Sequence, residues 1–396
     1  MPAYDAVLLV SFGGPEGPAD VLPFLRNVTR GRGIPQERLE EVGAHYQLFG
    51  GVSPINAQNA ALKAAVSAAL AYTGPDLPVY WGNRNWQPYL ADAVAAMRRD
   101  GVRRALAFVT AAYSSYSGCR QYRENLYDAV STVPGAPVID KVRPYFDHPG
   151  FVEPFVDAVI SSIASLPQPA RDGARLVFTT HSIPLAQADS SGLLAAPGGA
   201  YVAQHRATAQ LVADAVAQRT GTARDWDLVY QSRSGPPDQP WLEPDVSEHL
   251  EQLSRDGASG AVLVPIGFVS DHMEVVYDLD VVAAGTAARL GLPVARAATP
   301  GTDPRFVSMV VDLVRERLDG ADRPSVGGGR ATGSEAAEAA DATEAADATE
   351  AAEAAEAADA TVSRRALSPL GPWRDVCLAG CCPNPRGARP AMAGSD

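Results

Sequence analysis

Along residues 1 to about 322, short runs of apolar residues alternate with longer stretches in which apolar residues recur at helical spacing. The apolar runs predict buried strands at Ala6–Ser11, Val79–Trp81, Arg104–Thr110, Leu176–Thr180, Asp227–Gln231 and Ala261–Phe268. The intervening stretches predict helices, among them Asn56–Ala71, Tyr89–Arg99, Pro154–Ala164 and Ala203–Gln218. Strands that alternate with helices predict an α/β fold, in which helices cover both faces of a parallel sheet.

This alternation occurs twice, so it predicts two α/β domains, residues 1–150 and 151–322, with a boundary near Pro144 to Pro154. Ligands of parallel sheets bind beyond the carboxyl ends of the strands. Polar or glycine-rich segments follow several predicted strands directly, at residues 11–15, 82–85, 113–115, 181–182, 232–235 and 270–272. The pattern therefore predicts a binding site at these strand ends.

Charge changes the picture of the last quarter of the chain. The formal net charge is −13, and nine acidic residues, one at every third position, lie between Glu335 and Asp359. No basic residue lies between Arg330 and Arg364, and the chain without these nine acids carries −4. A three-residue period spreads the acids over all faces of a helix and leaves no apolar stripe. We expect residues 323–362 to form a solvated Ala-rich linker, with an acidic partner-binding segment as the alternative, and residues 363–396 to form a Cys-bearing tail.

The composition also excludes some classes of protein. An anionic chain is a poor candidate for nucleic-acid binding, which depends on basic patches. The longest nearly continuous apolar run, Gly260 to Ser270, is too short for a membrane span and contains a proline. The N-terminus has no basic segment before its first apolar run, so we expect a cytoplasmic protein. Four cysteines in 396 residues are too few for a disulfide framework.

Two polar segments after predicted strands carry candidate chemistry. His181 ends an apolar strand and is followed by Ser-Ile-Pro, so its position leaves a structural and a functional role equally open. Residues 271–274, Asp-His-Met-Glu, follow the most apolar strand and could bind a metal or transfer protons. Asp271 is expected to cap a helix there, and only one of His272 and Glu274 is expected to face a site.

The remaining motifs are weaker. Gly13-Gly14 follows the first strand without the spacing of a nucleotide fingerprint, so a tight turn is favoured over a phosphate cradle. The other histidines, His148, His205 and His249, lie in polar stretches and are expected at the surface, whereas position alone does not decide His45.

The cysteines form an uneven pattern, with Cys119 far from the group Cys377, Cys381 and Cys382. Four thiols are the number that an all-thiolate iron–sulfur cluster or a structural zinc requires. The alternative is coincidence, with three thiols in a loose tail and one elsewhere.

Several segments, in their joint order and spacing, resemble the ferrochelatase family over nearly all of residues 3–320. The matching segments are Leu-Leu-Val-Ser-Phe-Gly-Gly-Pro-Glu (8–16), Gly-Gly-Val-Ser-Pro-Ile (50–55), Tyr-Trp-Gly-Asn-Arg (80–84), Thr-His-Ser-Ile-Pro (180–184), Tyr-Gln-Ser-Arg-Ser-Gly-Pro (230–236), Trp-Leu-Glu-Pro (241–244) and Gly-Phe-Val-Ser-Asp-His-Met-Glu-Val-Val-Tyr-Asp-Leu-Asp (267–280). The resemblance implies two Rossmann-like domains of the chelatase fold with the active site in the cleft between them.

The resemblance also implies the reaction, which is insertion of Fe(II) into a porphyrin with release of two protons and without a nucleotide. The family's active-site histidine maps to His181 and its glutamate to Glu274, as catalytic residues and as ligands of the iron substrate. A neutral imidazole can bind iron or accept a proton. A carboxylate supplies a hard oxygen ligand and a route by which protons leave.

Porphyrin-binding residues follow from the same resemblance. Ser53 matches a donor to a substrate carboxylate, and Arg30, His45 and Tyr122 match more weakly. Phe12 stands where one family member has a tyrosine that binds iron. Because phenylalanine cannot bind iron, we expect Phe12 to pack against the porphyrin ring.

Some ferrochelatases hold a [2Fe–2S] cluster through one internal cysteine and three near the C-terminus, and Cys119, Cys377, Cys381 and Cys382 fit this plan. The adjacent pair Cys381-Cys382 departs from the animal pattern and is similar to that of high-GC Gram-positive bacteria. Enzymes of that type use coproporphyrin III, which carries four propionates, and form coprohaem. The alternatives are a protoporphyrin IX ferrochelatase and a non-catalytic porphyrin- or iron-binding protein. We expect a monomer that passes its product to a downstream enzyme of haem biosynthesis.

Overall fold

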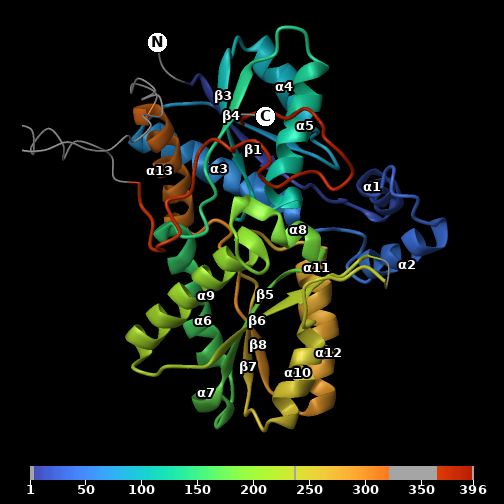
Figure 1. The fold of residues 1–396 in the computed structure, drawn as a ribbon, viewed down its shortest axis with the longest axis vertical. Coiled ribbons are helices and arrows are strands. Elements are labelled where there is room, and N and C mark those ends of the chain that lie inside the picture. The colour runs from blue at the N-terminus through green and yellow to red at the C-terminus, as the bar shows by residue number, and fades with distance from the viewer. Residues whose placement is uncertain (1–3, 236–237, 321–363, 395–396) are drawn as a thin grey trace, which may run out of the picture.

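The computed structural model describes residues 4–235, 238–320 and 364–394, which form two four-stranded parallel sheets (Figure 1). The N-terminal sheet has the strand order β2-β1-β3-β4, and the C-terminal sheet has the order β6-β5-β7-β8. The strands are β1 (Ala6–Ser11), β2 (Val79–Asn83), β3 (Arg104–Val109), β4 (Val138–Lys141), β5 (Arg175–His181), β6 (Trp226–Gln231), β7 (Ala261–Val264) and β8 (Val294–Arg296).

Helices connect the strands and cover the sheets. The α-helices are α1 (Val21–Val28), α2 (Gln36–Gln47), α3 (Ile55–Thr73), α4 (Leu90–Arg99), α5 (Gln121–Ser131), α6 (Pro149–Ser165), α7 (Ala170–Gly173), α8 (Leu185–Asp189), α9 (Gly199–Thr220), α10 (Val246–Arg255), α11 (Met273–Val275), α12 (Ala284–Leu290) and α13 (Pro304–Gly320). Two short segments are 3₁₀-helical, η1 (Pro18–Asp20) and η3 (Ser191–Leu193). Two others are π-helical, η2 (Tyr116–Arg120) and η4 (Val276–Ala283).

Both faces of each sheet are buried, which explains why the strands read as continuous apolar runs. In β1, Val7 and Leu9 belong to the large core that also contains residues of α3, α6, α9 and α13, whereas Leu8 points to the core under α4 and α5. In β5, Phe178 faces the large core and Val177 faces the core under α10 and α12. The large core is continuous between the two sheets, so they share one apolar interior.

Residues 364–394, which we call the C-terminal tail, run from α13 across the junction of the two sheets and along α5 (Figure 1). Trp373 of the tail inserts into the large core and contacts Phe146 edge-on, with 6.3 Å between ring centroids. Further along, the Arg389 guanidinium pairs with Asp128 of α5 at 2.9 Å. The tail is therefore packed against the body of the protein, and the predicted linker, residues 323–362, lies outside the described residues.

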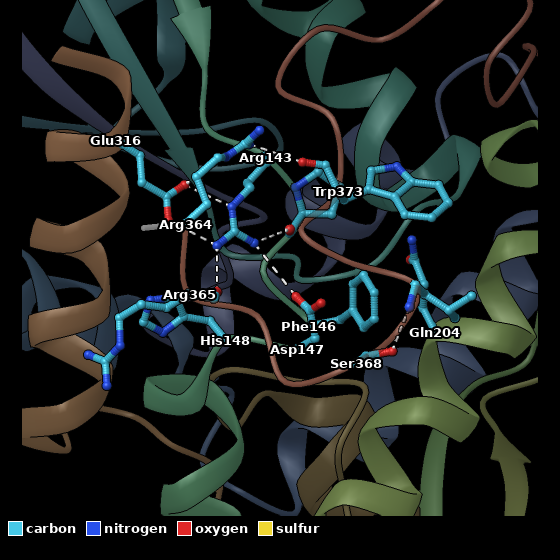
Figure 2. A network of polar contacts seen from close by, with 12 residues as sticks. Arg143, Phe146, Asp147, His148, Gln204, Glu316, Arg364, Arg365, Ser368 and Trp373 are labelled. Carbon is cyan, nitrogen blue, oxygen red and sulfur yellow. Dashed lines mark hydrogen bonds and ion pairs between the residues drawn. The ribbon is translucent and has the colours of Figure 1, made fainter. Parts of the chain in front are cut away.

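The start of the tail joins a buried ionic network (Figure 2). The Arg143 guanidinium donates two hydrogen bonds to the Glu316 carboxylate, at 2.8 and 3.0 Å, and a third to the backbone carbonyl of Arg365, at 2.8 Å. Asp147 lies 3.6 Å from Arg143, and Arg364 lies 3.5 Å from Glu316. Because Arg143 and Asp147 are fully buried, this network depends on its partners rather than on water.

Several predicted elements differ from the observed ones. The strand predicted for residues 261–268 ends at Val264, because Pro265 has no N–H to donate to a neighbouring strand. The helix predicted from Pro154 begins earlier, at Pro149, with His148 as its N-cap. The short strands β4 and β8 were not predicted, nor were the helices α1, α2, α5, α10, α12 and α13.

The prediction that His148 and His205 lie at the surface is wrong, since each is 1% exposed. His148 is buried because its Nδ1 accepts a hydrogen bond from the Gly150 backbone N–H and caps α6. His205 lies in the middle of α9 and is buried in the protein, where its ring stacks on Tyr113 with 3.5 Å between centroids. Burial lowers the pKa of both histidines to about 3, so both are neutral near pH 7.

Candidate active site

His181 lies at the carboxyl end of β5, and its ring faces Glu274. The Nε2 atom of His181 is 3.7 Å from Oε1 of Glu274, and its Nδ1 contacts the backbone carbonyl of Ser182. Because a carbonyl only accepts hydrogen bonds, Nδ1 carries a proton. Nε2 therefore presents its lone pair to the carboxylate when the ring is neutral and an N–H when the ring is protonated. A proton or a metal ion between the two side chains would therefore be held by both.

The side chains of His181 and Glu274 shift each other's pKa. Burial alone lowers the pKa of His181, but the Glu274 carboxylate opposes it and the net result is a raised pKa. Burial alone raises the pKa of Glu274, but His181, with smaller contributions from His272 and Arg32, lowers it to about 2. Their side chains are 29% and 48% exposed, so the pair is open to a ligand from one side.

A short helix, α11, positions Glu274. The N-cap of this helix is His272, whose Nδ1 accepts a hydrogen bond from the Glu274 backbone N–H at 3.2 Å. The prediction that Asp271 is the cap is wrong, because its carboxylate pairs with Arg296 at 3.2 Å. The backbone N–H of Asp271 instead donates to the Gln58 side chain of α3 at 2.8 Å, so the segment that carries Glu274 also contacts the N-terminal half.

A second carboxylate near the site belongs to Asp278, four positions after Glu274 in the sequence. It lies in the π-helix η4, which continues from α11, and its carboxylate accepts a hydrogen bond from the Ser232 hydroxyl. Burial raises the pKa of Asp278 to about 6, and the charge of Glu274 contributes to the increase. A carboxyl group with a pKa near working pH can both accept and release a proton. Sequence reasoning did not assign Asp278, although it lies within a segment that carries the family resemblance.

A hydrogen-bonded network supports His181 from the protein interior. The Tyr201 hydroxyl donates to the His181 carbonyl at 2.7 Å and also lies 2.9 Å from the Thr180 hydroxyl. The Thr180 hydroxyl lies 2.9 Å from Nε2 of His205. The Nδ1 atom of His205 is in turn 2.7 Å from the Tyr201 carbonyl. This network fixes the backbone at the end of β5, and with it the position of the His181 imidazole.

Aromatic and cationic side chains of the N-terminal half lie at the ends of β1 and β2. Phe12 follows β1 and packs edge-on against Phe24, with 6.2 Å between centroids. The Arg84 guanidinium, after β2, lies 5.4 Å from the Phe12 ring centroid and 4.9 Å from that of Tyr122. Cation–π distances of this size are favourable. Sequence reasoning did not assign Arg84, although the segment that ends in it carries the resemblance.

Ser53 packs against the turn after β1. Gly13 has a φ of +81°, and a Cβ added to it would lie 2.8 Å from Cβ of Asn83. A Cβ added to Gly14 would lie 2.7 Å from Cβ of Ser53, so this turn has room only for glycine. The Gly13-Gly14 pair thus forms the predicted tight turn, and it lets Ser53 approach the end of β1.

The two weaker candidates differ in their surroundings. The ring of His45, in α2, stacks on Tyr277 of η4 with 3.9 Å between centroids and 10° between planes, so it contacts the helix that continues from Glu274. Arg30 is exposed, and its guanidinium donates to the Asn27 side chain at 2.7 Å. The structure therefore brings His45 into contact with η4, whereas the partner of Arg30 among the described residues is a near neighbour in sequence.

All four cysteines form one buried cluster, although 258 residues separate Cys119 from Cys377. The Sγ atoms of Cys119 and Cys377 are 3.7 Å apart, and those of Cys381 and Cys382 are 3.9 Å apart. Hydrogen bonding from Cys119 lowers the pKa of Cys377 and raises that of Cys119 itself. The backbone N–H of Gly192 donates to Cys382 Sγ at 3.3 Å.

In the part of the chain that the structure describes, no three His, Cys, Asp or Glu side chains form a group that could hold a single metal ion. None of the helices there combines the length and apolarity that crossing a bilayer requires.

The family model described as Ferrochelatase matches residues 4–318. The chain belongs to the ferrochelatase family. Coproporphyrin III ferrochelatases of Streptomyces griseus and Streptomyces coelicolor are each 54% identical to it over 399 residues, covering 99% of this chain and 96% of the relative. The coproporphyrin III ferrochelatase of Frankia alni is 54% identical over 387 residues, covering 97% of this chain and 88% of the relative. The chain thus aligns with members of the family over almost its whole length, the C-terminal tail included.

Proposed function

We propose that this ferrochelatase inserts Fe(II) into coproporphyrin III and forms coprohaem. The observation that carries the proposal is the His181–Glu274 pair, in which Nε2 of the imidazole and Oε1 of the carboxylate lie 3.7 Å apart beyond the ends of the strands. The names of relatives that are 54% identical over nearly the whole chain support coproporphyrin III as the porphyrin.

The reaction requires two protons to leave the porphyrin for each iron that enters. Fe(II) replaces the two inner N–H protons, so the products are the iron porphyrin and two H⁺, and no electrons are transferred. His181 accepts a proton at Nε2 or binds the incoming iron there, and Glu274 supplies a hard oxygen ligand. Asp278, with a pKa of about 6, is placed to take protons onward from Glu274.

We assign the porphyrin to aromatic and polar side chains of the N-terminal half. Phe12 offers apolar contact to a flat ring, and Arg84 lies between it and the buried ring of Tyr122. Ser53 offers a hydroxyl to a propionate, and His45 and Arg30 are the remaining candidates for propionate contacts. A porphyrin that is held distorted exposes its nitrogen lone pairs, at the expense of binding energy elsewhere on the ring.

We also propose a [2Fe–2S] cluster held by Cys119, Cys377, Cys381 and Cys382. Two ligands of one tetrahedral metal with bonds near 2.3 Å are about 3.8 Å apart, which the pairs Cys119–Cys377 and Cys381–Cys382 match. Buried Lys141 and Arg123 lower the pKa of Cys377 further, which favours the thiolate form of that residue. The four thiols would hold the cluster, which supplies a redox-active iron centre when bound.

The experiment combines metallation and substitution. Purified protein receives Fe(II) and coproporphyrin III without oxygen, and the Soret band is followed beside the His181→Ala variant. We expect His181→Ala to lose at least about a hundredfold in kcat, the usual contribution of a general base. His249→Gln is the matched control, because His249 lies in α10 and pairs with Asp227.

Two outcomes would change the proposed function. Metallation no faster than the uncatalysed reaction would favour the non-catalytic porphyrin- or iron-binding protein. Faster metallation of protoporphyrin IX than of coproporphyrin III would replace the proposed substrate.

Four further properties stay predictions. They are the monomeric state, the cytoplasmic location, the downstream partner and the domain boundaries at residues 150 and 322.

A further inference from the structure

Three arginine side chains from distant parts of the sequence lie near one another beside the proposed porphyrin site. Arg32 follows α1, Arg84 follows β2, and Arg386 belongs to the C-terminal tail. Burial and the charges of Arg386 and Arg84 lower the pKa of Arg32, and the Glu274 carboxylate opposes this effect. Arg32 therefore lies within electrostatic range of the other two guanidiniums and of the catalytic carboxylate.

Two consecutive residues of η2 connect Arg84 and Arg386. The Arg84 guanidinium donates to the Ser117 carbonyl at 3.4 Å, and Arg386 lies beside the phenol of Tyr116. The Tyr116 hydroxyl in turn donates to Glu124 at 3.2 Å. Both guanidiniums are thus held against the segment that follows β3, at the carboxyl edge of the N-terminal sheet.

The structure fixes the backbone around Arg386 firmly. Its N–H donates to the Asn384 side chain at 2.9 Å, and the Asn384 amide donates to both oxygens of Glu124, at 3.1 and 3.2 Å. Glu124 is fully buried, and Arg120 on the same face donates to the Arg389 carbonyl at 2.7 Å. The tail therefore holds Arg386 in place before any ligand binds.

Among the residues that the structure describes, the three arginines have no carboxylate within ion-pair distance, although Glu274 acts on Arg32 from further away. Arg120 and Arg389 pair with Glu124 and Asp128, whereas Arg32, Arg84 and Arg386 form no ion pair with a described carboxylate. Like charges that are held together repel one another, and an anion between them relieves the repulsion. A guanidinium is also the side chain best shaped to hold a carboxylate through two hydrogen bonds.

We propose that Arg386 of the C-terminal tail is a substrate-binding residue, which holds a propionate of the porphyrin together with Arg32 and Arg84. This inference rests on the proposed function, because it takes a porphyrin carboxylate as the anion. It makes the tail part of the active site, and it assigns to the tail a share in the selection of porphyrins with several carboxylates.

Binding of metal-free coproporphyrin III, followed by quenching of porphyrin fluorescence, tests the inference. We expect Arg386→Gln to raise Kd about three- to tenfold, the effect of losing one partly exposed charge-assisted contact. KM should rise by a similar factor and kcat should stay near the wild-type value. Arg386→Lys should keep most of the affinity, and the wild-type affinity should fall more steeply with salt than that of Arg386→Gln.

The matched control is Arg255→Gln, which removes the same charge from α10, where Arg255 lies 4.0 Å from Glu251. An unchanged Kd in Arg386→Gln, with wild-type binding and metallation intact, would overturn the inference and leave the proposed function in place. Equal losses in Arg386→Gln and Arg386→Lys would also overturn it, because they would show a packing role rather than a charge. A wild-type protein that neither binds nor metallates coproporphyrin III would instead overturn the proposed function.

Discussion

At the scale of single residues, the site depends on one charge interaction that opposes burial. Burial by itself would lower the pKa of His181 below the ordinary value of 6.5. The charge of Glu274 opposes burial and raises the pKa above that value. Neutral His181 is the form that can accept a proton or bind iron. Iron insertion should therefore decline as the pH falls through this raised pKa.

Replacing Glu274 by glutamine tests this interaction directly. The amide keeps the shape of the side chain and removes its charge, so the pKa of His181 should fall. NMR titration of the protein with labelled histidine measures this pKa independently of activity. Glu243→Gln, which removes the same charge from an exposed carboxylate paired with Arg233, should leave it unchanged. A His181 pKa that is equal in the wild type and in Glu274→Gln would contradict this account.

At the scale of elements, the sequence predicts what depends on local burial. The strands β1, β3 and β5 are apolar on both faces and were placed within one or two residues. β8 was missed because it has three residues, all partly exposed, so it carries no apolar run. The cap of α11 was assigned to Asp271 instead of His272, because the choice depends on Arg296, which lies 25 residues further along the chain. The contact of the tail with α5 could not be predicted from the sequence either, since it joins residues more than 250 positions apart.

The packing of the tail against the buried ionic network should tolerate no side chain at Gly371. A Cβ there would lie 1.6 Å from Oδ2 of Asp147, and Asp147 cannot move away because it is fully buried beside Arg143 (Figure 2). We expect Gly371→Ala to lower the free energy of unfolding by about 1–3 kcal/mol, as overpacking does. Urea unfolding measures this change, and faster proteolysis of the tail should accompany it.

The control for this prediction is Gly285→Ala in α12. A Cβ at Gly285 meets no atom within 4 Å, so this variant should be unchanged or more stable by up to about 1 kcal/mol. If Gly371→Ala were as stable as the wild type, the tail would not be packed against Asp147 as the structure has it.

At the scale of the whole molecule, the four cysteines lie where three parts of the chain meet. Cys119 belongs to the N-terminal half, Cys377, Cys381 and Cys382 belong to the tail, and Gly192, which donates to Cys382, precedes α9 of the C-terminal half. The same tail carries Trp373 into the shared core and Arg386 to the proposed substrate site. A group bound by all four thiols would thus connect the tail to both halves.

The proposed [2Fe–2S] cluster predicts a coloured protein whose colour depends on each thiol. Protein prepared without oxygen under iron-replete conditions should show visible absorbance and contain iron and sulfide, and Cys382→Ser should lose all three. Val376→Ser is the matched control, because Val376 is an exposed tail residue next to Cys377 and contributes no thiol. Loss of the cluster should also lower the melting temperature, since a group that binds only the folded chain stabilises it. A colourless, iron-free wild-type protein would reject the cluster, and stoichiometric zinc in that protein would assign the four thiols to a structural zinc site instead.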